Sequence, residues 1–190
     1  MNYSDLKQIL LSDKPSEIIK ANEEEIFKMI PELYLCKGFN QNSPWHVYDV
    51  YEHILHVIDE VPKNETLRLA ALFHDIGKPF TYTEDENHIG HFRGHWVKSY
   101  EIFLEFSKKY QLDKKLIKST SNLIYFHDFN LDTSKDVIKR VVKNIGKSNI
   151  HSLYLLKKAD LLAQSSEYHY LLKELGQQEE KIKRLVKKWL

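Results

Sequence analysis

The stretch from Leu67 to Pro79, LRLAALFHDIGKP, constrains the fold more than any other part of the chain. Its apolar residues surround most of a helix, so this helix should be buried on most sides. The run ends in His74 and Asp75, and a buried carboxylate is costly unless a cation or several donors face it. A metal ion would satisfy this need. The alternative is an ordinary helix end, where His74 favours the negative end of the helix dipole and Asp75 and Gly77 terminate the helix.

The rest of the sequence predicts an all-α domain of about eight to ten helices. Apolar residues recur at helical spacing along nearly the whole chain, and no long run alternates as in a strand. Helices are predicted in the segments 4–30 (two short helices, the second starting near Pro15), 50–61, 67–74, 95–109, 116–127, 137–145 (after Thr133 and Ser134), 148–163 and, strongly amphipathic, 167–190. The polar loop from Thr81 to Gly94 is too long for a simple connector, which is typical of a functional or mobile segment.

Composition narrows the class of protein. Lys and Arg number 28 against 27 Asp and Glu, so the chain lacks the overall positive field that drives tight nonspecific nucleic-acid binding. Cys36 is the only cysteine, which excludes an internal disulfide and a zinc site built on paired cysteines. No apolar run approaches the roughly 20 residues that span a bilayer, and the amino terminus is too polar for a signal peptide. We therefore expect a cytoplasmic protein without membrane contact.

Six side chains that can bind metal ions stand at the ends or on the faces of otherwise apolar helices. They are His53, His74, Asp75, His95, His127 and Asp160. A lone histidine in such a place is more often a hydrogen-bonded core residue, but together the six form a full ligand set for two divalent ions. Imidazole and carboxylate ligands are compatible with Mn, Fe, Co, Ni, Zn or Mg, and they leave open whether one or two ions bind.

Five stretches resemble, in order and spacing, the HD superfamily of metal-dependent phosphohydrolases, in particular the HD domain attached to bacterial CCA-adding tRNA nucleotidyltransferases. They are GFNQNSPWHVYDVYEHILHVID, LRLAALFHDIGKP, HFRGHWVKSYEIF, LIYFHD and KKADLLAQS. The resemblance implies a single HD-type helical bundle over residues 38–165. A helical extension over residues 1–37 is expected to pack on this domain, and the amphipathic helix over residues 166–190 is expected to follow it.

The resemblance also assigns roles to the six residues. The four-ligand core of the family falls on His53, His74, Asp75 and Asp160, and the two additional histidines of its dinuclear members fall on His95 and His127. His91 matches a family histidine whose role stays open. Trp96 departs from the pattern, because relatives often have an acidic residue after the histidine at this place. No stretch resembles the nucleotidyltransferase head, so we do not expect nucleotide addition to tRNA.

These assignments predict a phosphodiesterase or phosphatase that acts on nucleotides or 2′,3′-cyclic phosphates through a dinuclear site. Asp75 and Lys78 are the expected catalytic residues, with Asp75 able to accept a proton as water is activated. Lys78 and Arg140 are the expected phosphate-binding cations, although either could be an ordinary solvated side chain. The aromatic residues that could stack on a base, or belong to the core, are Trp45, Tyr48 and Phe92.

Two alternatives stay open beside the dinuclear enzyme. A single ion on the four-ligand core would give a nucleotide monophosphatase. A regulatory or RNA-contacting module would instead use the fold without turnover. Its RNA-facing side would carry Lys114, Lys115, Lys118, Lys135, Lys139 and Lys143, although a solvated charged face explains the same lysines.

Overall fold

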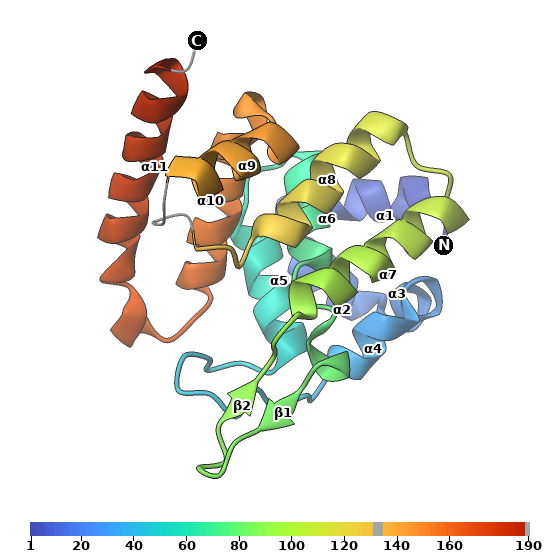
Figure 1. The fold of residues 1–190 in the computed structure, drawn as a ribbon. Coiled ribbons are helices and arrows are strands. Elements are labelled where there is room, and N and C mark those ends of the chain that lie inside the picture. Colours follow the sequence, from blue (N-terminus) through green and yellow to red (C-terminus); the bar gives the residue numbers. More distant parts are fainter. Residues whose placement is uncertain (131–134, 189–190) are drawn as a thin grey trace.

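The computed structural model describes residues 1–130 and 135–188, and these residues form an all-α fold, as predicted (Figure 1). They contain eleven α-helices, two short 3-10 helices and one small hairpin. This number of α-helices slightly exceeds the predicted eight to ten, because the segment 4–30 forms three helices instead of two and a further short helix spans Pro31–Cys36. Of the predicted features, Thr133, Ser134 and the last two residues of the amphipathic segment lie outside the described residues.

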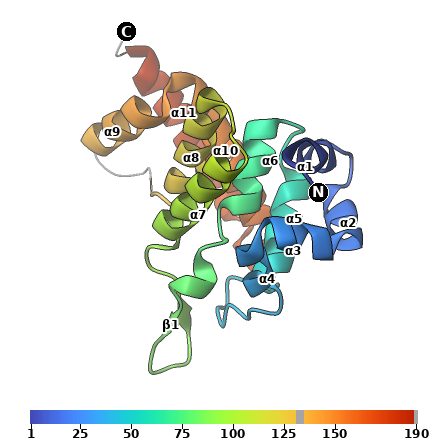
Figure 2. The same cartoon turned by 90° about the vertical axis from the view of Figure 1, so that its right-hand side faces the viewer.

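The four amino-terminal helices are short because proline and asparagine interrupt them. They are α1 (Tyr3–Leu10), α2 (Pro15–Ala21), α3 (Glu23–Met29) and α4 (Pro31–Cys36). Pro15 and Pro31 each take the first helical position, where the missing N–H costs nothing. The four helices lie together on one side of the molecule (Figure 2). Their apolar residues Leu6, Ile19, Ile26 and Leu33 are fully buried in the same core as the later helices.

Helices α5 (Val50–Glu60) and α6 (Glu65–Phe73) form the centre of the fold. Each begins at a side-chain cap: Asp49 accepts a hydrogen bond from the Glu52 N–H, and Asn64 accepts one from the Leu67 N–H. Helix α6 contacts α1, α5, α7, α8 and α10, and its residues from Leu69 to Phe73 have no exposed surface. The predicted burial of this helix on most sides is therefore confirmed.

A small hairpin follows the central helices. After the 3-10 helix η1 (Lys78–Phe80), strands β1 (Thr83–Glu84) and β2 (Gly90–His91) pair antiparallel, with Thr83 opposite His91. The sequence predicted only a loop here, because two-residue strands are too short to show alternation. At its base the hairpin packs against the loop before α5, where a Cβ on Gly90 would lie 2.2 Å from the Gln41 carbonyl oxygen. Only glycine allows this approach.

The second half of the chain packs its helices against the centre from two sides (Figure 1). These helices are α7 (His95–Lys109), α8 (Lys114–Phe126), α9 (Lys135–Ile145), α10 (Lys147–Leu162), η2 (Ser166–Tyr168) and α11 (Leu171–Lys188). Helix α8 packs between α7 and α6, while α10 contacts α5 and α11. The amphipathic α11 buries Ile182 in the core. None of the described helices is both long and apolar enough to cross a membrane. The three-part division of the chain stays a prediction.

Candidate metal centre

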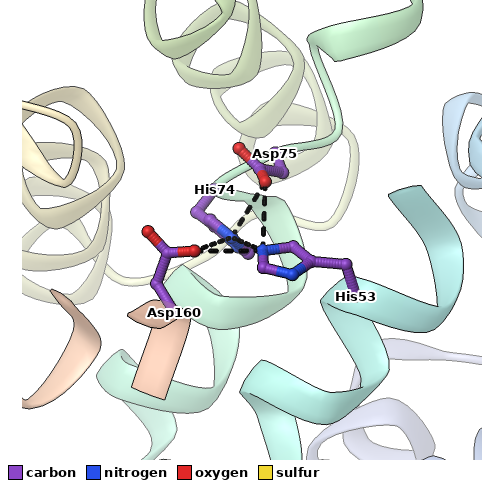
Figure 3. Close-up of side chains that lie close together, drawn as sticks. All are labelled: His53, His74, Asp75 and Asp160. Carbon is purple, nitrogen blue, oxygen red and sulfur yellow. Dashed lines mark hydrogen bonds and ion pairs between the residues drawn. The ribbon is translucent and has the colours of Figure 1, made fainter. Parts of the chain in front are cut away.

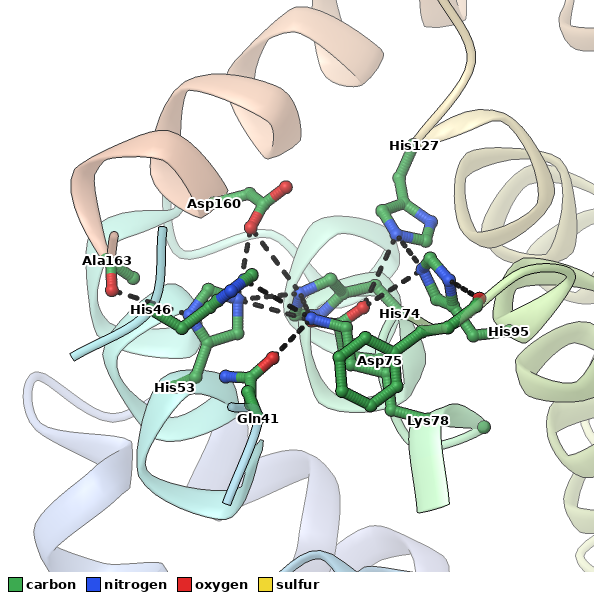
Figure 4. A network of polar contacts seen from close by, with 12 residues as sticks. Gln41, His46, His53, His74, Asp75, Lys78, His95, His127, Asp160 and Ala163 are labelled. Carbon is green, nitrogen blue, oxygen red and sulfur yellow. Dashed lines mark hydrogen bonds and ion pairs between the residues drawn. The ribbon is translucent and has the colours of Figure 1, made fainter. Parts of the chain in front are cut away.

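The six expected metal ligands converge from five helices (Figure 4). His53 projects from α5, and His74 with Asp75 follows the last turn of α6. The other three come from later in the chain: His95 opens α7, His127 follows α8, and Asp160 lies in the last turn of α10. All are buried except Asp160, whose side chain keeps 21% of its exposure. The apolar runs therefore place these polar groups at the helix ends that meet in the core.

The first group of ligand atoms has the spacing that one ion requires (Figure 3). His53 Nε2 lies 3.0 Å from Asp160 Oδ1 and 3.3 Å from Asp75 Oδ2. His74 Nε2 lies 3.3 Å from Asp75 Oδ2 and 4.0 Å from Asp160 Oδ1. Two atoms that both bind an ion at about 2.1 Å are about 3.0–4.2 Å apart, depending on the angle between the bonds. These four side chains fit a single divalent ion.

The second group uses the other oxygen of the same aspartate. Asp75 Oδ1 lies 3.2 Å from His95 Nε2 and 3.6 Å from His127 Nε2, and the two imidazole nitrogens are 3.1 Å apart. These three residues form a separate cluster with metal-ligand spacing. Asp75 therefore faces one group of ligand atoms with each of its carboxylate oxygens, so either oxygen could contribute to an ion-binding site.

Backbone contacts orient the imidazole rings. The Nδ1 atoms of His74, His95 and His127 lie 2.7–2.8 Å from the carbonyl oxygens of Ala71, Phe92 and Ile124, in each case the residue three positions earlier. A carbonyl can only accept a hydrogen bond, so each Nδ1 carries a proton and each Nε2 points into the cluster, where it can bind a metal ion. The Nε2 atoms of His95 and His127 lie 3.1 Å apart, so one proton or one cation can be shared between them.

Electrostatics in the metal-free cluster shows how strongly it attracts positive charge. Burial lowers the pKa of His53, but Asp160 and Asp75 outweigh it and raise the pKa to about 9. Burial alone would raise the pKa of Asp75, yet the nearby His74 and Lys78 hold it well below its usual range. The pKa of Asp160 is also lowered, because hydrogen bonding and charge from His53 outweigh burial. Both carboxylates are thus ionised, and protons occupy positions that metal ions would take.

Lys78 is a buried member of this cluster. Its Nζ lies 2.6 Å from Asp75 Oδ2 and donates a 2.7 Å hydrogen bond to Gln41 Oε1. It also lies 3.4 Å from His46 Nε2 and 5.2 Å from the centre of the Phe92 ring. Burial and Lys78 lower the pKa of His46 to about 3, so the neutral imidazole can accept from the ammonium group. The side chain is therefore not an ordinary solvated lysine.

A pocket of about 280 Å³ opens onto the cluster. Besides four of the ligands, its lining includes Trp45, His46, Lys78, His91, Phe92, Arg93, Trp96, Asp128 and Gln164. His91 lies beside Asp85, with 3.0 Å between Nε2 and Oδ2. Tyr48 stacks on His56 at 4.2 Å and is not among the lining residues, and neither is Arg140, which is exposed on α9. Of the predicted phosphate-binding cations, the structure brings Lys78 but not Arg140 to the ligands.

Sequence reasoning missed several members of the site. Gln41 and His46 lie in a segment for which no helix was predicted, and nothing in the pattern connects them to Lys78. Lys157 had a usable signal, because it stands three residues before Asp160 and so one turn away on the same helix. Its ammonium group donates to the His127 carbonyl oxygen. Lys157 thus joins the helix that carries Asp160 to the end of α8.

Comparisons with known proteins agree with this geometry. The family model of the HD domain matches residues 45–165. The CC-adding tRNA nucleotidyltransferase of Thermus thermophilus is 30% identical over 162 residues, which cover 81% of this chain and 36% of that protein. The multifunctional CCA protein of Cupriavidus necator is 32% identical over 96 residues, which cover 47% of this chain and 23% of that protein. The chain thus spans about a third or less of either relative.

The residues matched by the family model include all six metal-ligand candidates and all residues that line the pocket in front of them except Ser43. The expected resemblance is confirmed, both for the domain and for its relatives. The chain belongs to the HD domain family, within the superfamily of metal-dependent phosphohydrolases.

Proposed function

We propose that the protein is a phosphodiesterase or phosphatase that hydrolyses nucleotides or 2′,3′-cyclic phosphates at a site for two divalent ions. The observation that carries this proposal is the placement of Asp75, whose two oxygens face two separate ligand groups. The names of the relatives, which are tRNA nucleotidyltransferases, support a substrate of nucleotide type. A cytoplasmic location stays a prediction.

The charge of the site favours phosphate. With two divalent ions on Asp75 and Asp160, and with Lys78 beside Asp75, about three positive charges face the pocket. Bound divalent ions supply Lewis-acid polarisation of a phosphoryl oxygen and lower the pKa of water. The chain's own residues set up this chemistry: Asp75 fixes the separation of the two ligand groups, and Lys78 keeps Asp75 ionised. Lys78 also lines the pocket, where its charge adds to the attraction for a phosphate oxygen.

The pocket favours a small phosphate ester with an aromatic group. Its volume of about 280 Å³ holds a phosphate and a sugar, so a base would lie at the rim. Trp45 is 46% exposed at this rim, although its ring packs on Tyr168 at 4.1 Å and its carbonyl accepts a hydrogen bond from the Ser165 N–H. An exposed indole that is held in place provides a stacking surface for a base.

A mononuclear nucleotide monophosphatase is the second candidate. It is favoured by the first ligand group, which offers two histidines and two carboxylates and can hold one ion without His95 and His127. RNA contact without turnover has weaker support. Lys114, Lys115 and Lys118 are exposed on α8, which agrees with an RNA-facing surface and equally with a solvated one.

The test is metal analysis of protein purified without chelator, followed by a screen of nucleotides and cyclic phosphates with each candidate metal. We expect about two ions per wild-type chain and about one in His127→Ala, because only the second group is damaged. The matched control is His56→Ala, whose exposed ring stacks on Tyr48 outside the pocket. One ion in the wild type, with full activity in His127→Ala, would favour the mononuclear enzyme. No hydrolysis with any metal would refute both.

A further inference from the structure

Two segments form the rim of the pocket in front of the metal ligands. Trp45 belongs to the loop before α5, Arg93 lies between the hairpin and α7, and Trp96 lies in the first turn of α7. These segments are held together by the hydrogen bond from the Gly90 N–H to the Asn42 carbonyl, which is 2.8 Å long. The backbone on both sides of Arg93 is also fixed, because the Phe92 carbonyl accepts a hydrogen bond from His95 Nδ1 and the Gly94 carbonyl accepts one from the Val97 N–H. Arg93 is therefore presented from a supported backbone.

The guanidinium group of Arg93 has no partner among residues 1–130 and 135–188. Arg93 is exposed, and it makes no hydrogen bond or ion pair with any residue in the described part of the chain. Asp128, the exposed carboxylate of the same rim, is not paired with it. When two divalent ions are bound, an arginine in this place would face a positive site, which is unfavourable unless an anion lies between them. The planar guanidinium group, with five N–H donors, matches phosphate oxygens well.

The charge of the pocket exceeds that of a single phosphodiester. A 2′,3′-cyclic phosphate carries one negative charge, whereas the loaded site presents about three positive charges before Arg93 is counted. The negative charge of Asp128 and the positive charge of Arg93 cancel, so the total stays at about three positive charges. A second phosphate group on the same substrate would balance the excess. It would also give Arg93 a partner, which the described part of the chain does not provide.

We propose that Arg93 forms a subsite for a second phosphate group, so that the preferred substrate is a nucleotide with two or more phosphates. This inference rests on the proposed function, because the metal ligands must hold the first phosphate. The second phosphate is either joined to the first, as in a nucleoside diphosphate, or attached elsewhere on the ribose, as in a nucleoside bisphosphate. Both share the chemistry that Arg93 would recognise, and only their spacing differs.

Binding to the metal-loaded full chain tests the subsite without relying on turnover. Calorimetry with Mn²⁺-loaded protein would compare AMP, α,β-methylene-ADP and adenosine 3′,5′-bisphosphate. We expect at least one of the two-phosphate ligands to bind about tenfold or more tightly than AMP. Arg93→Met should reduce this preference to about threefold or less, because it removes a charge-assisted contact while keeping most of the side-chain volume. The two-phosphate ligand that loses its advantage over AMP in Arg93→Met shows how far apart the two phosphate groups of the preferred substrate lie.

The matched control is Arg184→Met, which removes an exposed arginine from α11, away from the pocket. It should keep the wild-type preference. Equal affinity of the wild type for all three ligands, or an unchanged preference in Arg93→Met, would overturn the subsite. The proposed function can fail separately. An Arg93-dependent preference in a protein that hydrolyses no phosphate ester would leave the subsite standing and refute the hydrolase.

Discussion

Gly77 lies where η1 meets the start of α7, and replacing it with alanine should damage the metal centre from a distance. Its backbone has an ordinary φ of −79°, so alanine could adopt the conformation. The obstacle is space. A Cβ at this position would lie 2.5 Å from the His95 carbonyl oxygen and 2.7 Å from the Ser99 nitrogen. The Gly77 N–H also donates to Ser99 Oγ at 2.9 Å, so the two segments cannot separate without losing a buried hydrogen bond.

The size of the effect follows from these distances. To restore ordinary contact, the first turn of α7 or the η1 segment has to move by about 0.5–1 Å, and such overpacking costs about 1–3 kcal/mol. For a chain of this length that corresponds to a loss of roughly 3–8 °C in melting temperature. Metal–ligand distances tolerate shifts of only about 0.2 Å, so displacing His95 should weaken the second ion about 10–100-fold. The first group lacks His95 and should keep its ion.

The assay is calorimetric titration of metal into chelator-treated protein, together with thermal denaturation. Gly176→Ala is the matched control, because a Cβ there meets no atom within 4 Å and the site lies within α11. It should stabilise the protein by up to about 1 kcal/mol through helix propensity and leave both ions unchanged. If Gly77→Ala binds the second ion with wild-type affinity, the link between this packing contact and the metal centre is wrong.

Two further outcomes follow from buried groups of the site. Lys157→Met should lower the affinity for the second ion more than the affinity for the first, because it removes the contact to the His127 carbonyl. Lys158→Met, at the exposed neighbouring position, should change neither affinity. Equal losses of affinity at both sites in a metal titration would contradict this. In chelator-treated protein, folding raises the pKa of His53 from 6.5 to about 9. Protonation of His53 therefore stabilises the fold fully below pH 6.5, and this contribution to stability is lost as the pH rises through 9. The melting temperature without metal should therefore fall over this range, and the metal-loaded protein should not show that fall; a flat profile without metal would exclude this role of His53.

The helices and the candidate ligands were predictable from sequence because both depend on local pattern. His74 and His127 each end an apolar run, and the periodicity of that run places its end in the core. The role of Lys78 could not be read in this way. Its contact with Asp75 is local, but its burial depends on Gln41 and His46, which approach from a distant loop. The same applies to the hairpin, whose position depends on the absence of a side chain at Gly90.

The candidate ligands of the two groups are spread from residue 53 to residue 160, so a bound ion would close long loops of the chain. The unfolded chain cannot gather these side chains, and cation binding would therefore favour the native state over it. Saturation at about 1,000 times the dissociation constant would add about 4 kcal/mol to the stability of the native state. In a cell that is short of the cation, more chains would open and reach proteases. Turnover of the protein would then report on metal supply, independently of any reaction that it catalyses.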